Sequence, residues 1–297
     1  MITGTQYEIA DGEHRVWVSE VGATLRGYRV GDREVTVVHH PDRLPPKSNG
    51  AVLMPWPNRI RDGHYAFGGQ DLQLALTEPA NGNASHGLAN WVRWSLTAQT
   101  PNELSLACDV VPQKGWPFEL RAEVTYRVEA AGGLSVRLGA QNTGAVALPF
   151  GAGCHPYLTV GNVALDDVEL MVPAERRIAT DERSLPVDTV DVAGTGYDFR
   201  TRRRLGALRL DTAFTGLRQR DGREHVELRA GERTTRVWWD AVAFSTVQVF
   251  TLPTLIDGAA VAVEPMTCPA DAFNSGTDLR VLQAGESWSA EWGIEPD

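Results

Sequence analysis

A histidine stands between a cysteine and a proline in the stretch FGAGCHPYLTVG, residues Phe150–Gly161. Imidazole serves as a general acid or base near neutral pH and also as a metal ligand. Pro156 favours an extended backbone at His155 and removes a ladder donor, which predicts a strand end or edge. Adjacent strand residues point to opposite faces, so a zinc site shared with Cys154 is unfavourable. A histidine packed in the core and one that faces a pocket as an acid–base group both remain open.

A carboxyl group, Glu264, closes the apolar run GAAVAV and again precedes a proline. In a strand, Val261 and Val263 share one face, while Ala262 and Glu264 share the other. Small residues on the glutamate's face leave open space above the sheet. Burying an unpaired carboxylate is costly, so Glu264 is expected to be paired, hydrogen-bonded or near a pocket mouth. An ordinary edge glutamate is the alternative.

Two turn-rich segments carry further polar groups, MPWPNRIRDGHYAFGGQ and NGNASHGLANWVRW. Arg59 follows two prolines, and a guanidinium after a rigid turn can present its donors to hydroxyls or to a carboxylate. His86 lies in a loop with Trp91 and Trp94 just beyond it. Aromatic rings stack on the C–H faces of sugars while polar groups bind their hydroxyls, so this loop suits a carbohydrate site.

The composition excludes several classes of protein. The 297 residues are 42% hydrophobic and 22% charged, which is ordinary for a soluble globular chain. The net charge of −10 argues against nucleic-acid binding, and the basic run Arg202–Arg204 is expected on a solvated edge or loop. Cys108, Cys154 and Cys268 are far apart, which predicts buried free thiols and neither a metal site nor disulfides.

The ends and the apolar runs of the chain indicate no targeting segment. The N-terminus lacks a signal-peptide pattern, and no apolar run approaches the roughly 18 residues that cross a bilayer. A cytoplasmic protein without membrane contact is therefore expected. No dinucleotide-binding glycine motif appears, and the sequence gives no indication of oligomeric state.

Alternation with period two dominates the chain. Residues 121–142 predict a hairpin, with Val124, Tyr126 and Val128 before a turn at 130–133 and further alternation after it. Residues 14–21, 103–111, 234–250 and 259–265 read as further strands. Short helical turns are expected only near Ala174–Ile178 and Asp278–Leu282. Residues 1–297 are thus predicted to form a single all-β domain, a large antiparallel sandwich with few short helices.

Six short motifs, taken in order, resemble the aldose 1-epimerase (galactose mutarotase) family. They are NRI at 58–60, HG at 86–87, HPYL at 155–158, LDTAF at 210–214, VQVF at 247–250 and VEP at 263–265, followed by PADAFNSG. They run from about residue 20 to the C-terminus. The stretches MPWPNRIRDGHY, HPYLTVG and VEPMTCPADAFNSG look most like a bacterial branch typified by sulfoquinovose mutarotase-like proteins.

The resemblance implies a fold, an activity and a set of site residues. The family's fold is a large β-sandwich, and its activity interconverts the α and β anomers of a free sugar without metal or organic cofactor. By this resemblance, Glu264 is the catalytic base and His155 the catalytic acid, at segments that end at one cleft. The residues that it implies for sugar binding are Arg59, His86, Asp211 and Gln248.

Departures from the family pattern leave the sugar open. Many relatives have a YTGN-like segment where this chain has FTLPT at 250–254, and Met266 follows Pro265. A neutral hexose and an acidic sugar are both compatible with Arg59. The alternatives are a glycoside hydrolase or lyase that pairs Glu264 with Asp211 or Asp240, a hexose-6-phosphate epimerase, and a non-catalytic sugar-binding sandwich.

Overall fold

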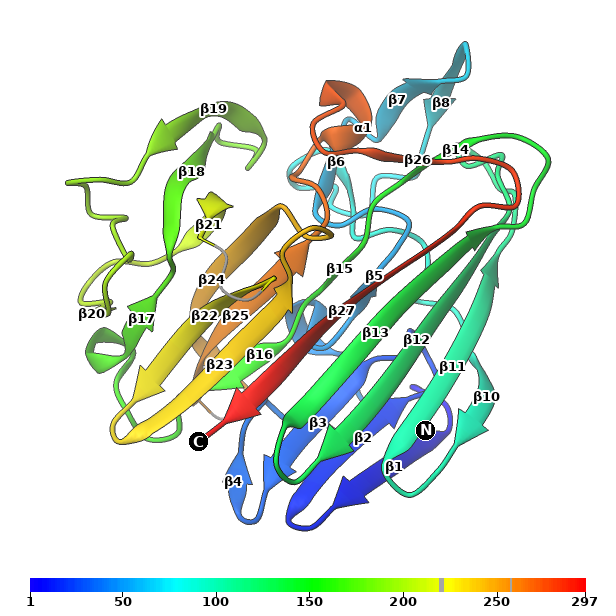
Figure 1. Cartoon of the computed structure of the whole chain (residues 1–297). Helices are drawn as coiled ribbons and strands as arrows, with labels where there is room; N and C mark the ends of the chain where they lie inside the picture. The colour runs from blue at the N-terminus through cyan, green and yellow to red at the C-terminus, as the bar shows by residue number, and fades with distance from the viewer. Residues whose placement is uncertain (219–221, 257) are drawn as a thin grey trace.

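The computed structural model describes residues 1–218, 222–256 and 258–297, and strands account for most of them (Figure 1). Within these ranges the helical elements are one short helix, α1 (Ala272–Ser275), and two 3-10 turns, η1 (Pro46–Ser48) and η2 (Leu165–Asp167). The strand pairs that the structure describes within the sheets are antiparallel. The predicted all-β class is therefore confirmed.

The largest sheet has nine strands and faces the viewer in Figure 1. In spatial order these are β10 (Ser95–Gln99), β11 (Glu103–Val110), β12 (Leu120–Glu129), β13 (Gly133–Asn142), β27 (Ser287–Pro296), β23 (Arg233–Asp240), β22 (Arg223–Ala230), β17 (Glu169–Met171) and β20 (Arg203–Arg204). The predicted hairpin is its centre, since β12 and β13 pair from Glu129 with Gly133 back to Leu120 with Asn142.

A second sheet of eight strands lies behind β22 and β23 in Figure 1. Its order is β19 (Pro186–Asp191), β18 (Ala174–Thr180), β21 (Asp211–Leu217), β24 (Thr246–Leu255), β25 (Gly258–Met266), β15 (Gly153–Cys154) and β5 (Val52–Leu53), with β16 (Tyr157–Thr159) also paired to β25. The predicted strand 234–250 is thus two strands in different sheets, β23 and β24, because the chain turns at 241–243.

Smaller sheets complete the molecule. One has four strands, β1 (Gln6–Asp11), β2 (His14–Ser19), β3 (Leu25–Val30) and β4 (Arg33–Glu34). Three are pairs: β14 (Leu148–Phe150) with β26 (Arg280–Leu282), β6 (Arg59–Arg61) with β9 (Asn83–Ser85), and β7 (His64–Phe67) with β8 (Gln70–Gln73).

Successive side chains along β24 and β25 alternate between the core face of the sheet and its polar face. Val261 and Val263 are fully buried and belong to the same core cluster as Val226 and Val237 of the nine-stranded sheet. Glu264, directly opposite Gln248 on β24, points to the other face. The predicted division of faces is confirmed. However, Glu264 does not end its strand, because β25 continues to Met266.

Both expected helical turns are wrong. Residues 174–178 belong to β18, which pairs with β19 and β21, and 280–282 form β26. Ala174 and Ile178 are buried. A spacing of four residues returns to the same face in a helix and in a strand alike, so the pattern alone did not distinguish them. Strand pairing decided the outcome, with the next strand β19 and with β21 for β18, and with the distant β14 for β26.

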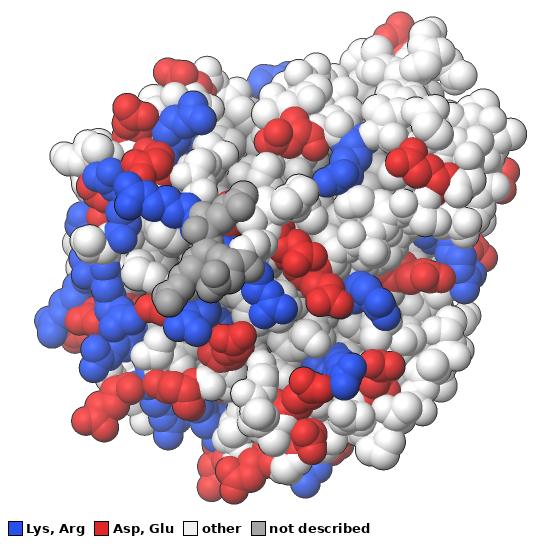
Figure 2. Space-filling view, in the orientation of Figure 1, with Lys and Arg blue, Asp and Glu red and all other residues white. Residues whose placement is uncertain are grey.

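The basic run lies at the edge of the nine-stranded sheet, as expected. Arg202 pairs with Glu227, Arg204 pairs with Asp167, and the Arg203 guanidinium lies over the Phe199 ring. Figure 2 shows basic and acidic atoms interleaved on this side of the molecule, with no uniformly basic surface on the face in view. Among the described residues, the search for a membrane-spanning helix found none of sufficient length and apolarity.

Candidate active site

A cavity of about 320 Å³ opens over the polar face of β24 and β25. This volume is at the small end of the range for ligand pockets. Its lining includes every site residue predicted from the sequence, namely Arg59, His86, His155, Asp211, Gln248 and Glu264. Residues as far apart in the sequence as Arg59 and Glu264 therefore line one cavity. Its charged and polar side chains can bind the donors and acceptors of a small polar ligand.

His155 occupies the break between the short strands β15 and β16. Its backbone N–H donates to Ala51 O at 3.1 Å, and its carbonyl accepts from Gly50 N at 2.9 Å. The side chain is 6% exposed, and its Nε2 lies 3.5 Å from Oε1 of Glu264, which is 2% exposed. The two predicted acid–base groups are thus adjacent and almost enclosed.

Burial shifts the pKa values of this pair in opposite directions. It raises the pKa of Glu264 well above its usual value, with Asp211 adding to the rise and Arg59 opposing it. It lowers the pKa of His155 well below its usual value, with His86 and Arg59 adding to the fall. Both shifts favour the uncharged forms, a protonated Glu264 carboxyl group and a neutral His155 ring.

The HG motif places the His86 ring beside the His155 ring, with an interplanar angle of 74°. Its ring meets the His155 ring edge to face, with 5.4 Å between centroids. His86 has a positive φ of 64°, and its N–H donates to Asn58 O at 2.8 Å. A Cβ on Gly87 would lie 2.1 Å from Met54 O, so only glycine fits after the histidine. Burial lowers the pKa of His86 to about 4, so its ring is neutral.

Arg59 is held by a carboxylate that the sequence reading missed. Its Nε donates to Glu78 Oε2 at 2.7 Å and one Nη donates to Glu78 Oε1 at 2.9 Å. The other Nη donates to Asn58 Oδ1 at 3.2 Å. Asp271, from the PADAFNSG motif, donates its N–H to Arg59 O at 2.6 Å. The guanidinium is therefore fixed and largely neutralised.

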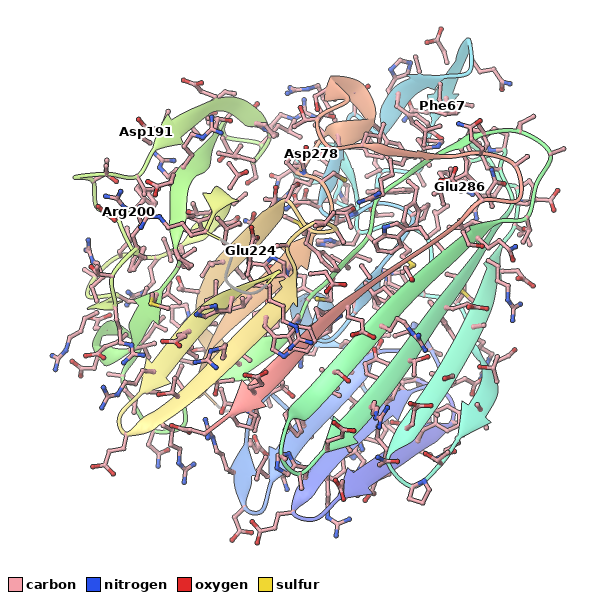
Figure 3. The ribbon with its side chains drawn as sticks, in the orientation of Figure 1. Phe67, Asp191, Arg200, Glu224, Asp278 and Glu286 are labelled. Atoms are coloured by element: carbon pink, nitrogen blue, oxygen red, sulfur yellow. The ribbon has the colours of Figure 1, made fainter. Side chains whose placement is uncertain are left out.

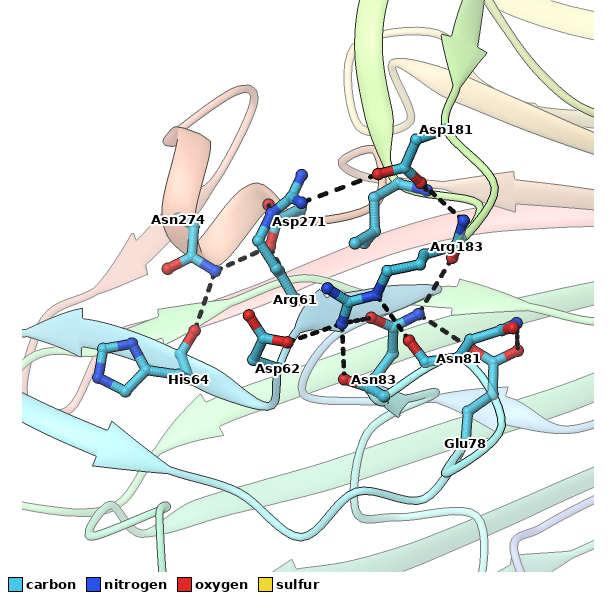
Figure 4. Close-up of polar contacts among 12 residues, drawn as sticks. Arg61, Asp62, His64, Glu78, Asn81, Asn83, Asp181, Arg183, Asp271 and Asn274 are labelled. Carbon is cyan, nitrogen blue, oxygen red and sulfur yellow. Dashed lines mark hydrogen bonds and ion pairs between the residues drawn. The ribbon is translucent and has the colours of Figure 1, made fainter.

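A second arginine holds the loop that carries Glu78 (Figure 4). Arg183, between β18 and β19, donates to Asn81 O at 2.8 Å, to Gly82 O at 3.0 Å and to Asn83 Oδ1 at 3.3 Å. The Asn81 and Asn83 side-chain amides in turn donate to the Glu78 carboxylate at 3.1 and 3.2 Å. Through Arg183, a continuous hydrogen-bond network therefore links the loop between β18 and β19 to Arg59.

Asp211 and Gln248 form the remaining predicted part of the wall. Asp211 begins β21 opposite Phe250, and the Gln248 amide donates to its carboxylate. Gln248 is 6% exposed whereas Asp211 is exposed, so the carboxylate keeps free acceptor capacity toward the cavity. This pairing fixes the amide orientation beside Glu264.

Several lining residues had no clear sequence signal. Lys47 and Ser48 reach the cavity because the segment after η1 pairs with the His155 backbone. Tyr157 follows His155 by two residues and shares its face, which the HPYL motif contained without indicating a role. Of the two tryptophans noted near His86, Trp91 lines the cavity and is 54% exposed. Trp94 is buried and donates to Ala89 O, so it is structural.

Other carboxylates that the sequence offered lie elsewhere. Asp240 accepts from Glu291 N in the nine-stranded sheet and does not line this cavity. Glu224, labelled in Figure 3, is buried on β22 and accepts from the Trp239 indole at 2.9 Å. Burial raises its pKa as it does that of Glu264. Within the described parts of the chain, no three His, Cys, Asp or Glu side chains gather in a way that could hold a metal ion.

Solved structures share this architecture over nearly the whole chain. A GalM/aldose epimerase homologue from C. elegans superposes with a TM-score of 0.85 at 17% identity, covering 99% of this chain and 98% of its own. Galactose 1-epimerase from Lactobacillus acidophilus superposes with a TM-score of 0.81 at 20% identity, covering 98% and 95%. These likenesses establish the fold as the β-sandwich of the mutarotases.

The sequence identifies the family itself. Residues 5–295 match the aldose 1-epimerase family, so the chain belongs to it. The protein is accordingly a sugar epimerase, an isomerase that acts on a small sugar. It is also 32% identical to the protein YihR of Escherichia coli K12 over 288 residues, which cover 96% of this chain and 91% of that one.

Proposed function

We propose that the protein catalyses exchange between the α and β anomers of a free aldose, with Glu264 and His155 as its acid–base pair. The observation that supports this most directly is their adjacency, with Nε2 and Oε1 3.5 Å apart in a nearly enclosed cavity. Anomer exchange needs one group to remove a proton and another to supply one. A non-catalytic sugar-binding protein has no need for such a pair.

The proposed reaction has three steps. Glu264 takes the proton of the C1 hydroxyl while His155 protonates the ring oxygen, and the C1–O5 bond breaks. The open aldehyde rotates about C1–C2. The ring then closes on the other face, with the two groups acting in reverse. Each general acid–base contact contributes about 10²–10⁴-fold to such a reaction.

The proton count of the pair sets the pH range of the proposed activity. One proton must be present, and it must pass to His155 when the sugar is bound. At low pH a second proton on His155 leaves no base, and at high pH loss of the Glu264 proton leaves no acid. The pKa of His155 is lowered and that of Glu264 is raised. We therefore expect a bell-shaped rate profile whose acidic limb lies below 6.5, the usual pKa of histidine.

The rest of the cavity is proposed to hold the sugar hydroxyls while C1 turns. Arg59, His86, Asp211 and Gln248 supply donors and acceptors for this. Arg59 is a poor partner for an acidic substituent because Glu78 already neutralises it. Lys47 lines the cavity, and no ion pair joins it to a carboxylate of the described residues. A neutral aldose therefore needs only the fixed wall, whereas an acidic sugar would also engage Lys47.

The experiment is to follow anomer equilibration by exchange NMR or polarimetry across free sugars, with neutral and acidic members. Acceleration by the wild-type protein that disappears in Glu264→Gln and in His155→Asn supports the proposal. Release of reducing sugar from a glycoside would instead favour the hydrolase. Preference for a sugar 6-phosphate would favour the phosphate-sugar epimerase, and binding without acceleration would leave a sugar-binding module.

A further inference from the structure

His155 lacks the hydrogen bond that usually orients a working histidine. An acid–base imidazole is normally fixed by a carboxylate or carbonyl that accepts from its second ring nitrogen. Here Nδ1 of His155 is buried without a hydrogen-bond partner among the described residues. Its Nε2 faces Glu264, which must remain free to exchange protons. No hydrogen bond to a neighbouring residue of the described chain therefore sets the plane of this ring.

Two aromatic contacts hold the ring instead. The Tyr157 ring lies nearly parallel to it, with an interplanar angle of 20° and 5.1 Å between centroids. The His86 ring meets it edge to face. Stacked and edge-to-face arrangements are the preferred geometries of aromatic pairs, and two such contacts on one ring restrict rotation of its plane.

Tyr157 owes its own position to packing. Of the four fully buried tyrosines in the described chain, three use their hydroxyls: Tyr28 with His14, Tyr65 with Gly115 and Tyr126 with Ala23. The Tyr157 hydroxyl has no partner there, although its burial is complete. The ring, and not the hydroxyl, is therefore what fixes this residue.

The small residues of β25 make room for the ring. Tyr157 pairs directly with Ala262, and both belong to a local apolar cluster with Val37, Leu255 and Ala260. Phe250 meets the Tyr157 ring edge to face at 6.4 Å. The open space expected above the alanines is thus filled here by Tyr157 and Phe250, whose side chains also line the cavity beside Glu264.

We propose that Tyr157 is a positioning residue whose ring, seated on Ala262, sets the plane of the His155 imidazole for proton transfer. This inference rests on the proposed function, in which His155 is the acid. Because no acceptor of another residue in the described chain holds Nδ1, the imidazole can lose and gain protons in both directions of the reaction without breaking a hydrogen bond to a neighbouring element. Packing against Tyr157 fixes the plane of the imidazole, and the proton of the ring can still be transferred.

The test compares two substitutions at one position. Tyr157→Phe keeps the ring and is expected to retain kcat within about twofold. Tyr157→Leu removes the stacked face, and misplacement of a reacting group by about 1 Å can lower kcat about 10²-fold. KM should change little, because Arg59 and Asp211 are untouched. Tyr126→Phe is the control for loss of a buried tyrosine hydroxyl outside the cavity lining. Equal kcat values for the Leu and Phe variants would overturn the proposal.

A second readout needs no catalysis. The His155 ring is titrated by NMR in the wild type and both variants. Its charged or titratable neighbours Glu264, His86 and Arg59 stay in place, so a change reports the loss of the stacked ring. Water admitted by Tyr157→Leu should raise the His155 pKa toward 6.5, while Tyr157→Phe leaves it unchanged. An unchanged titration in the Leu variant would refute the positioning role, whereas failure of the wild type to exchange any sugar's anomers would refute only the proposed activity.

Discussion

Replacing Glu264 by glutamine is expected to weaken catalysis and strengthen the fold at the same time. The amide has nearly the same shape as the carboxyl group, but it cannot accept the proton of the C1 hydroxyl. We expect anomer exchange to fall about 10²–10⁴-fold, the contribution of one general base. The fold should tolerate the change, because the neutral amide resembles the protonated carboxyl that burial already favours.

The gain in stability follows from the direction of the pKa shift. An unfolded glutamate ionises near 4.5, whereas burial holds the proton on Glu264 to higher pH. Unfolding therefore releases this proton between the two pKa values, and wild-type stability falls there by about 1.4 kcal/mol per pH unit. Glu264→Gln has no such proton and should lack this fall. The variant's gain in free energy of unfolding over the wild type should be absent below pH 4.5 and should grow as the pH rises toward the raised pKa of Glu264.

Urea unfolding of both proteins at several pH values between 4.5 and 8 measures the difference. His155 affects both proteins, since its lowered pKa costs stability only as pH falls below 6.5. Glu224→Gln is the matched control, because this buried glutamate also has a raised pKa but lies outside the cavity. It should leave anomer exchange unchanged. Parallel stability curves for wild type and Glu264→Gln would refute the burial argument, and near-normal exchange would remove Glu264 from the mechanism.

Three further substitutions address the cavity wall. Arg183→Met should raise KM several-fold with little change in kcat, because the loop that holds Glu78 against Arg59 loses the hydrogen bonds from Arg183. Steady-state kinetics measure both constants, and a fall in kcat alone would contradict the prediction. Trp91→Ala should raise KM about tenfold by removing an exposed aromatic face for sugar stacking, and sugar titrations should show the same loss of affinity. Lys47→Met should weaken turnover of acidic sugars only, and an equal effect on neutral sugars would exclude a charge-specific role.

The parts of the fold that depend on local pattern could be predicted from the sequence. Alternation and a glycine turn defined the β12–β13 hairpin, and the same alternation put Val263 in the core and Glu264 on the polar face. The strand β26 was missed because its partner β14 lies far away in the sequence, and β18 was missed because its spacing of apolar residues fits a helix as well as a strand. Local spacing carries no information about such partners.

The candidate site divides in the same way. The acid–base pair and four wall residues came from motif order, and the structure places all six around one cavity. Glu78 could not be predicted as a site residue from the sequence, because its contact with Arg59 depends on the pairing of β6 with β9. Tyr157 is part of the HPYL motif, but the motif indicates no role for it. The role proposed for Tyr157 comes from the stacking of its ring on His155.

The location of the acid–base pair explains how the chain can bury it. Glu264 lies within a strand whose other face, Val261 and Val263, packs in the core, and among the described residues no lysine or arginine forms an ion pair with it. The nearest arginine is occupied by Glu78. An ion pair from Arg59 to Glu264 would hold the carboxylate charged and lower its pKa, leaving no proton to pass to His155. With its guanidinium bound to Glu78, Arg59 leaves the pKa of Glu264 raised, so the proposed catalytic pair keeps the proton that the proposed mechanism needs. Glu78→Gln should therefore free Arg59 toward Glu264 and move the alkaline limb of the rate profile to lower pH.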